Sequence, residues 1–112
     1  MPHLVISYAA TLAQDTDMPA LVNAVFAAAE ASTLFGAKDI KVRAIPVEAY
    51  LTGGADQPFV HVEIKLLPGR SDMQRKDLAE RVLDTLKATL PATAALSVET
   101  VELHKESYAK RV

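Results

Sequence analysis

Residues 59–74 read FVHVEIKLLPGRSDMQ, and they join an alternating strand to a capped helix across a sharp turn. Every second residue in the first half of this stretch is apolar, which is the pattern of a strand with one buried face. A Pro-Gly pair ends that strand, and Ser71 with Gln74 forms the S-x-x-Q capping box that begins a helix. The stretch therefore predicts a strand over 59–67 and a helix starting at Ser71.

The predicted helix is amphipathic and leads to a last strand. Apolar residues recur at every fourth position on one helix face, at Leu78, Val82, Leu86 and Leu90. Pro91 ends the helix because proline cannot donate the next backbone hydrogen bond. Residues 96–103 then alternate as a strand, so the second half of the chain has the order β-α-β.

The first half of the chain repeats this layout. Residues 3–8 predict a strand, and Asp17 is a suitable N-cap for a helix. That helix is expected over 18–34, stopped by the glycine at position 36. A second strand is expected over 40–51. Helical crossovers of this length favour parallel strands within each half.

Two β-α-β units predict an α+β fold with two layers, a four-stranded sheet carrying two helices on one face. A chain of 112 residues is enough for one domain and too short for two, so residues 1–112 are expected to form a single domain.

The other face of the predicted sheet is mixed in character. It carries Lys41, Arg43, Ile45, Val47, Phe59, His61, Glu63 and Lys65. Burial against another subunit would explain this mixture, because a domain this small leaves much of its surface exposed. A half-solvated sheet with scattered apolar groups is the alternative.

Composition excludes several kinds of site. A net charge of −2 argues against nucleic-acid binding, and the chain has no cysteine for a disulfide, a thiolate metal site or a nucleophile. His3, His61 and His104 lack metal-ligand spacing, so they are expected to be structural. The apolar runs are too short to cross a membrane and the N-terminus does not resemble a signal peptide, so we expect a cytoplasmic protein with no membrane partner.

Three cations are candidates for binding an anion. Lys41 and Arg43 lie two apart on a predicted strand and therefore leave the same face, where they could bind a carboxylate or simply be solvated. Arg70 lies between a strand and a helix N-terminus, a place that favours anions. The alternative for Arg70 is an ordinary exposed loop arginine.

Pro2 is the candidate catalytic base. If Met1 is removed, as a small second residue favours, Pro2 carries a secondary amine on a rigid ring. An unperturbed α-amino group titrates near roughly 7.7–8.0, and nearby cations or burial lower this value toward the pH that suits proton transfer. The alternative is that Pro2 only opens a strand.

Several of these segments together resemble the 5-carboxymethyl-2-hydroxymuconate Δ-isomerase family of the tautomerase superfamily. The resemblance rests on Pro2-His3, Lys41-Val42-Arg43, Phe59-Val60-His61-Val62, Gly69-Arg70-Ser71 and Glu102-Leu103-His104. The segment from Leu67 to Gln74 is also similar to the first strand-to-helix turn of 4-oxalocrotonate tautomerase, a shorter relative.

The resemblance implies a tautomerase-like β-α-β repeat, a homotrimer, no cofactor and a small-molecule carboxylate substrate. It implies that Pro2 and Arg43 are catalytic and that Lys41 and Arg70 bind substrate. Lys41 stands where closer relatives have an arginine, which keeps the charge but loses the bidentate fork. Two other functions stay open, a phenylpyruvate-type tautomerase and a non-catalytic trimeric protein that binds anions.

Overall fold

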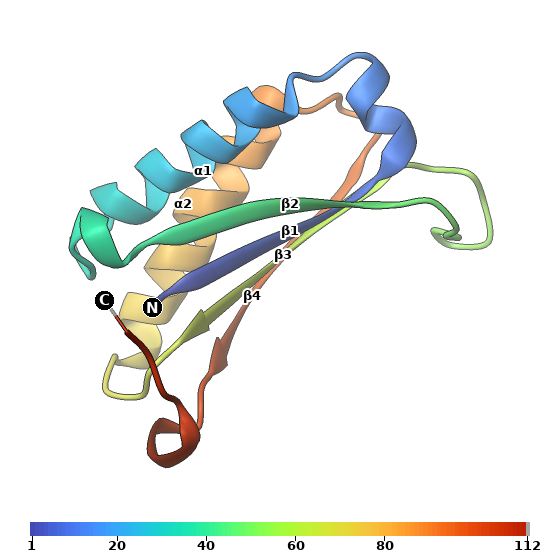
Figure 1. Cartoon of the computed structure of the whole chain (residues 1–112). Helices are drawn as coiled ribbons and strands as arrows, with labels where there is room; N and C mark the ends of the chain where they lie inside the picture. Colours follow the sequence, from blue (N-terminus) through green and yellow to red (C-terminus); the bar gives the residue numbers. More distant parts are fainter. Residues whose placement is uncertain (112) are drawn as a thin grey trace.

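Alternation and capping in the sequence produce a two-layer structure, which the computed structural model describes over residues 1–111 (Figure 1). Four strands form one sheet, and two long helices lie together over one of its faces. The predicted fold class is confirmed. In chain order the elements are β1 (His3–Ala9), η1 (Ala10–Gln14), α1 (Met18–Ala31), η2 (Ala37–Asp39), β2 (Lys41–Val47), β3 (Phe59–Leu66), α2 (Asp72–Thr89), β4 (Ala95–Glu102) and η3 (Lys105–Ser107).

The sheet has the strand order β2-β1-β3-β4. Each half of the chain forms a parallel pair, β1 with β2 and β3 with β4, as the lengths of the crossovers predicted. The two halves meet through the antiparallel pair β1–β3, in which His3 lies opposite Lys65. The N-terminal end of β1 therefore lies beside the C-terminal end of β3.

The core lies between the sheet and the helices. Its central side chains are fully inaccessible to solvent and come from both layers: Leu4, Ile6, Val60, Val62, Ile64 and Leu66 from the strands, and Leu21, Val25, Leu78, Val82 and Leu86 from the helices. These are the apolar positions that alternate along the strands and recur along the helices. The apolar face of the sheet therefore packs against the apolar faces of the two helices.

Both predicted helix starts are confirmed. Asp17 Oδ1 accepts a hydrogen bond from the backbone N–H of Ala20 at 3.0 Å. The capping box of α2 is complete, because Gln74 N donates to Ser71 Oγ at 3.1 Å and Ser71 N donates to Gln74 Oε1 at 2.9 Å. These bonds satisfy backbone donors that a helix N-terminus leaves free.

Two predicted element ends are wrong. Helix α1 stops at Ala31, because the Ser32 side chain turns back to the Ala29 carbonyl and Thr33 takes the left-handed conformation, so the glycine at 36 is not the stop. Strand β2 stops at Val47, because its partner strand β1 ends in register with it. Beyond Val47, β2 has no neighbouring strand whose backbone could form further hydrogen bonds with it.

The helix-free face of the sheet has the mixed composition that the sequence predicted. Ile45 keeps 46% of its surface exposed there, beside charged groups such as the Lys65–Glu63 ion pair at 3.3 Å. His61 lies on this face and bonds Ser97 Oγ at 2.7 Å and Glu99 Oε2 at 2.5 Å, so it has the structural partners expected of it. Coverage of this face by another subunit stays a prediction.

Leu78→Ala should destabilise the protein strongly, because Leu78 is fully buried where α2 packs on the sheet. We expect a loss of about 2–5 kcal/mol in the free energy of unfolding, from lost transfer energy plus a cavity. Urea unfolding at a fixed protein concentration measures it. Met73→Ala in the same helix is the matched control, since Met73 is 83% exposed, and equal losses in the two variants would contradict this core.

Candidate active site

The N-terminal end of β1 gathers most of the residues that the sequence singled out. Its parallel pairing with β2 places His3 opposite Lys41 and Val5 opposite Arg43. The Lys41 backbone N–H donates to the Pro2 carbonyl at 3.1 Å, which fixes the start of β2 against Pro2. The Pro2 ring is fully buried. The predicted neighbours Pro2, Lys41 and Arg43 thus share one end of the sheet.

This end of the sheet disfavours positive charge on an amine. Burial lowers the pKa of the Met1 amine below its ordinary value, followed by a hydrogen bond with Lys41 and the positive charges of Lys41 and Lys110. The Asp39 carboxylate acts in the opposite direction. The Lys41 ammonium also donates to the Asp39 carbonyl at 3.2 Å. An amine placed here is biased toward its neutral form, which is the form that can accept a proton.

Arg43 contacts His3, and His3 contacts Tyr108. The Arg43 Nη1 atom lies 3.4 Å from His3 Nδ1, and His3 Nε2 lies 2.9 Å from the Tyr108 hydroxyl. The His3 and Tyr108 rings meet edge to face, with centroids 6.1 Å apart and planes at 77°. Tyr108 follows η3, so the C-terminal segment returns to the start of the chain.

The surroundings of His3 favour its neutral imidazole. Burial lowers the pKa of His3, and the positive N-terminus, Arg43, Lys41 and Lys65 lower it further. A lowered pKa in the folded state means that the unfolded chain binds the proton more tightly. The free energy of unfolding is therefore highest above the ordinary histidine pKa. It decreases as the pH falls through the lowered pKa of His3 in the folded state.

Arg70 lies at the same end of the sheet, but its side chain points to a different set of partners. The guanidinium donates to the Leu34 carbonyl at 3.1 Å and to the Leu67 carbonyl at 3.4 Å, and it lies over the Phe35 ring at 4.9 Å from the centroid. Among residues 1–111, no hydrogen bond joins it to Pro2, Lys41 or Arg43. Arginine has five N–H donors, so three remain for an anion.

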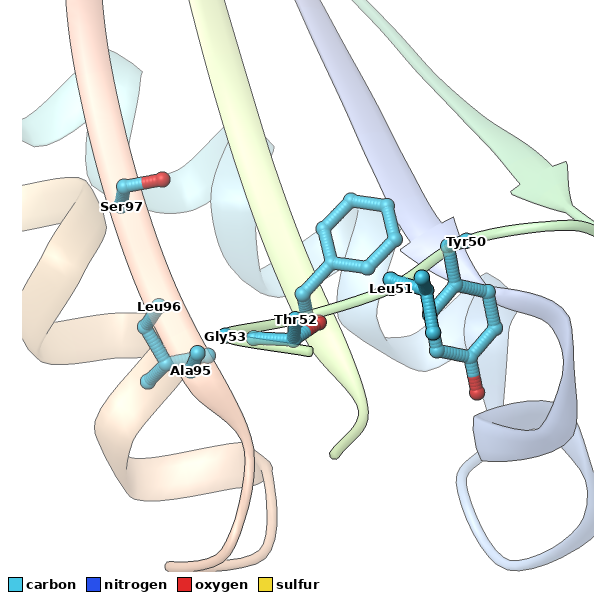
Figure 2. A pocket seen from close by; sticks show the side chains of 8 residues that line it. Tyr50, Leu51, Thr52, Gly53, Ala95, Leu96 and Ser97 are labelled. Carbon is cyan, nitrogen blue, oxygen red and sulfur yellow. The ribbon is translucent and has the colours of Figure 1, made fainter. Parts of the chain in front are cut away.

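A hollow of about 570 Å³ lies at the opposite end of the sheet (Figure 2). Its walls come from the segment after β2 and from the first residues of β3 and β4: Tyr50, Leu51, Thr52, Gly53, Phe59, Ala95, Leu96 and Ser97. None of these side chains carries a positive charge, whereas the Pro2 end carries several. The positive charges therefore make the Pro2 end, and not this hollow, the better candidate for binding an anionic substrate.

Within residues 1–111, no group of three His, Asp or Glu side chains is arranged as metal ligands would be. The same part of the chain contains no helix that is both long and apolar enough to span a bilayer.

Sequence reasoning missed two residues of this site. His3 was expected to be structural, and it has side-chain partners in Arg43 and Tyr108; its place beside Arg43 was not predicted, because it depends on the pairing of β1 with β2. Tyr108 was not singled out, because nothing local indicates that the segment after η3 returns to β1.

Comparison with known proteins identifies the family of this chain. The pattern of the 5-carboxymethyl-2-hydroxymuconate isomerase family matches residues 2–111. The 5-carboxymethyl-2-hydroxymuconate Delta-isomerase of Escherichia coli is 28% identical over 111 residues, covering 93% of this chain and 88% of the relative.

Solved structures share the fold. A crystal structure of 5-carboxymethyl-2-hydroxymuconate delta-isomerase superposes with a TM-score of 0.84 at 23% identity, covering 100% of this chain and 88% of that one. The isomerase from Deinococcus radiodurans R1 gives 0.80 at 23% identity, with 98% and 88% covered. A macrophage migration inhibitory factor-like protein from Entamoeba histolytica gives 0.77 at 12% identity, with 98% and 95% covered. With the match over residues 2–111, the chain belongs to the 5-carboxymethyl-2-hydroxymuconate isomerase family and is an isomerase.

Proposed function

We propose that this isomerase moves a proton between carbons of an unsaturated 2-oxo acid, with Pro2 as the base once Met1 is removed. The observation that carries the proposal is the position of Pro2 at the N-terminal end of the sheet, where its carbonyl accepts from the Lys41 backbone at 3.1 Å and β2 places Lys41 and Arg43 next to the start of β1. Burial and Lys41 also lower the pKa of the Met1 amine at this end. After Met1 is lost, the Pro2 amine would be the chain terminus directly before β1, where the Pro2 carbonyl already accepts from the Lys41 backbone. A neutral amine near working pH is suited to general base catalysis.

The reaction needs no net change in oxidation state. Pro2 nitrogen would accept a proton from the enol oxygen or one carbon of the substrate, and the electron pair would shift along the conjugated system. The protonated Pro2 would then return the proton to another carbon. Because the proton taken equals the proton returned, the balance closes without a cofactor.

The neighbouring cations have distinct proposed roles. Arg43 would stabilise negative charge that builds on the 2-oxygen in the transition state, and a donor so placed contributes about 10²–10³-fold. Lys41, which lies beside the terminal amine, would bind a carboxylate. Arg70 would bind a second carboxylate with the N–H groups that Leu34 and Leu67 leave free.

The substrate class follows from these charges and from the family. Several cations at one end of the sheet fit a substrate with more than one carboxylate. The family name points to 5-carboxymethyl-2-hydroxymuconate as the first compound to test. An aromatic 2-oxo acid such as phenylpyruvate is the comparison compound, because it carries a single carboxylate.

We also propose that the working form is a homotrimer. The support is the helix-free face, where Ile45 is 46% exposed among charged side chains. A structure of similar fold, at 17% identity, is described as a symmetric trimer of fused 4-oxalocrotonate tautomerase. Sedimentation or light scattering of this chain measures the oligomeric state directly.

Pro2→Ala should lower kcat/KM by about 10²-fold, because the variant keeps an amine but loses the basicity and rigidity of the ring. The assay follows ketonisation of 5-carboxymethyl-2-hydroxymuconate by ultraviolet absorbance, using protein whose loss of Met1 is verified by mass. Protein that retains Met1 should be inactive, since its Pro2 nitrogen is an amide. Pro19→Ala is the matched control, and an undiminished kcat/KM in Pro2→Ala or measurable activity in the Met1 form would refute Pro2 as the base.

Arg70→Ala should raise KM for the dicarboxylate more than Arg43→Ala does, whereas Arg43→Ala should mainly lower kcat, by about 10²-fold. Steady-state kinetics on both variants separates the two effects. Because Arg70 also bonds two carbonyls, thermal unfolding must show that the variant is folded. Arg81→Ala, which removes only a surface pair with Asp77, is the control, and exchanged kinetic effects would mean that the roles are reversed.

A further inference from the structure

We propose that His3 is a positioning residue. Its neutral imidazole would hold both Arg43 and the C-terminal segment at the Pro2 end of the sheet through hydrogen bonds. Three side chains from distant parts of the sequence form this chain of contacts, Arg43 to His3 to Tyr108, at 3.4 Å and 2.9 Å. The consequence for activity rests on the proposed function, in which Arg43 stabilises charge on the substrate.

The chemistry of Arg43 fixes the tautomer of His3. A guanidinium only donates hydrogen bonds, so His3 Nδ1 must offer its lone pair to Arg43. The ring proton of the neutral imidazole then lies on Nε2, which donates to the Tyr108 hydroxyl oxygen. Tyr108 is compatible with either tautomer, because its hydroxyl can accept from Nε2–H or donate to an unprotonated Nε2, so Arg43 alone sets the choice.

Protonation breaks this arrangement. An imidazolium carries a hydrogen on both nitrogens, so Nδ1 would turn from an acceptor into a donor facing Arg43. The charges around His3 add to the cost, since the N-terminus, Lys41 and Arg43 are positive. Lys65 is also positive, although Glu63 pairs with it. As the pH falls below the ordinary range of histidine, Arg43 is released and the Tyr108 contact weakens.

Tyr108 extends the effect to the C-terminal segment. Tyr108 is partly buried although its neighbours on both sides are exposed, and its ring packs edge to face on His3. The contact spans 105 positions of sequence, so the order of the tail over the Pro2 end depends on the state of one imidazole. Lys110 of the same tail contributes positive charge at the terminal amine.

Nitrogen-15 NMR of the histidine ring tests the tautomer without any substrate. In the wild type near neutral pH, His3 should show an unprotonated Nδ1 and a protonated Nε2. Arg43→Gln should shift the ring toward a mixture of tautomers, because Nδ1 loses a partner that can only donate. Tyr108→Phe should keep the tautomer but shift the Nε2 resonance, because Nε2–H loses its acceptor. Tyr50→Phe, at the far end of the sheet, should leave the His3 resonances unchanged. A wild-type ring protonated on Nδ1, or one unaffected by both substitutions, would overturn the proposal.

The pH profile of kcat/KM tests the consequence. Two groups, Pro2 and His3, must be unprotonated in the wild type, so its activity should fall with a two-proton slope at acid pH. His3→Gln keeps an acceptor and a donor but does not titrate, so it should retain activity and fall with a one-proton slope. His3→Leu should lose activity at every pH, and Tyr108→Phe should lower kcat/KM by about fivefold, the worth of one ordinary hydrogen bond.

The controls separate this proposal from the proposed function. His104→Gln, at an exposed histidine, should keep the wild-type slope. Identical slopes in the wild type and His3→Gln would refute the role of His3 even if the isomerase activity is strong. If the processed wild type converts no 2-oxo acid at all, the proposed function fails, and the NMR experiment alone decides whether His3 fastens Arg43 and Tyr108.

Discussion

The antiparallel pairing of β1 with β3 holds the two halves of this protein together, and the site depends on it. Each half is a β-α-β unit whose sheet face is apolar on one side only, and neither half alone could cover it. The pairing places Leu4 opposite Ile64 and Ile6 opposite Val62, all fully buried, so the centre of the sheet is also the centre of the core. The same register sets His3 opposite Lys65 and thereby brings the turn that follows β3 to the start of β1. Displacing the register by one residue would turn every side chain to the other face, which would remove the core and the site together.

The end of the sheet built in this way concentrates positive charge around a chain terminus. Lys41, Arg43, Lys65 and Lys110 all act on the amine or on His3, with Asp39 as the carboxylate acting on the amine in the opposite direction. Such repulsion costs stability in a free protein, because like charges lie close together in partly buried surroundings. Neutral forms of the amine and of His3 reduce that cost, and an anionic substrate removes more of it. In the proposed mechanism, a neutral Pro2 amine, a neutral His3 imidazole and an acidic substrate would each be favoured by the same positive charges.

Most of the fold could be predicted from the sequence because its determinants are local. Alternation in β3, the Ser71–Gln74 capping box and the Asp17 cap each act within a few residues, and all were confirmed. The end of α1 was not predictable from the glycine at 36, because Ser32 bonds back to the helix before the chain arrives there. Of the candidate site, the shared face of Lys41 and Arg43 follows from alternation alone. The contacts of His3 and Tyr108 do not, since they require the pairing of β1 with β2 and the return of a tail 105 positions away.

The exposure of Lys41 and Arg43 connects the proposed catalysis with the proposed trimer. Lys41 and Arg43 are both exposed in one subunit, and a cation in bulk water stabilises a carboxylate or a developing enolate only weakly. The interaction strengthens when water is excluded, because the local dielectric constant falls. The surface that would have to be covered is the helix-free face, and its apolar members, such as the 46% exposed Ile45, supply a hydrophobic reason for covering it. A second subunit on this face would bury Ile45 and desolvate Arg43 in the same step. In the proposed trimer, the hydrophobic energy that drives association would thus also raise the strength of the charges that act on substrate.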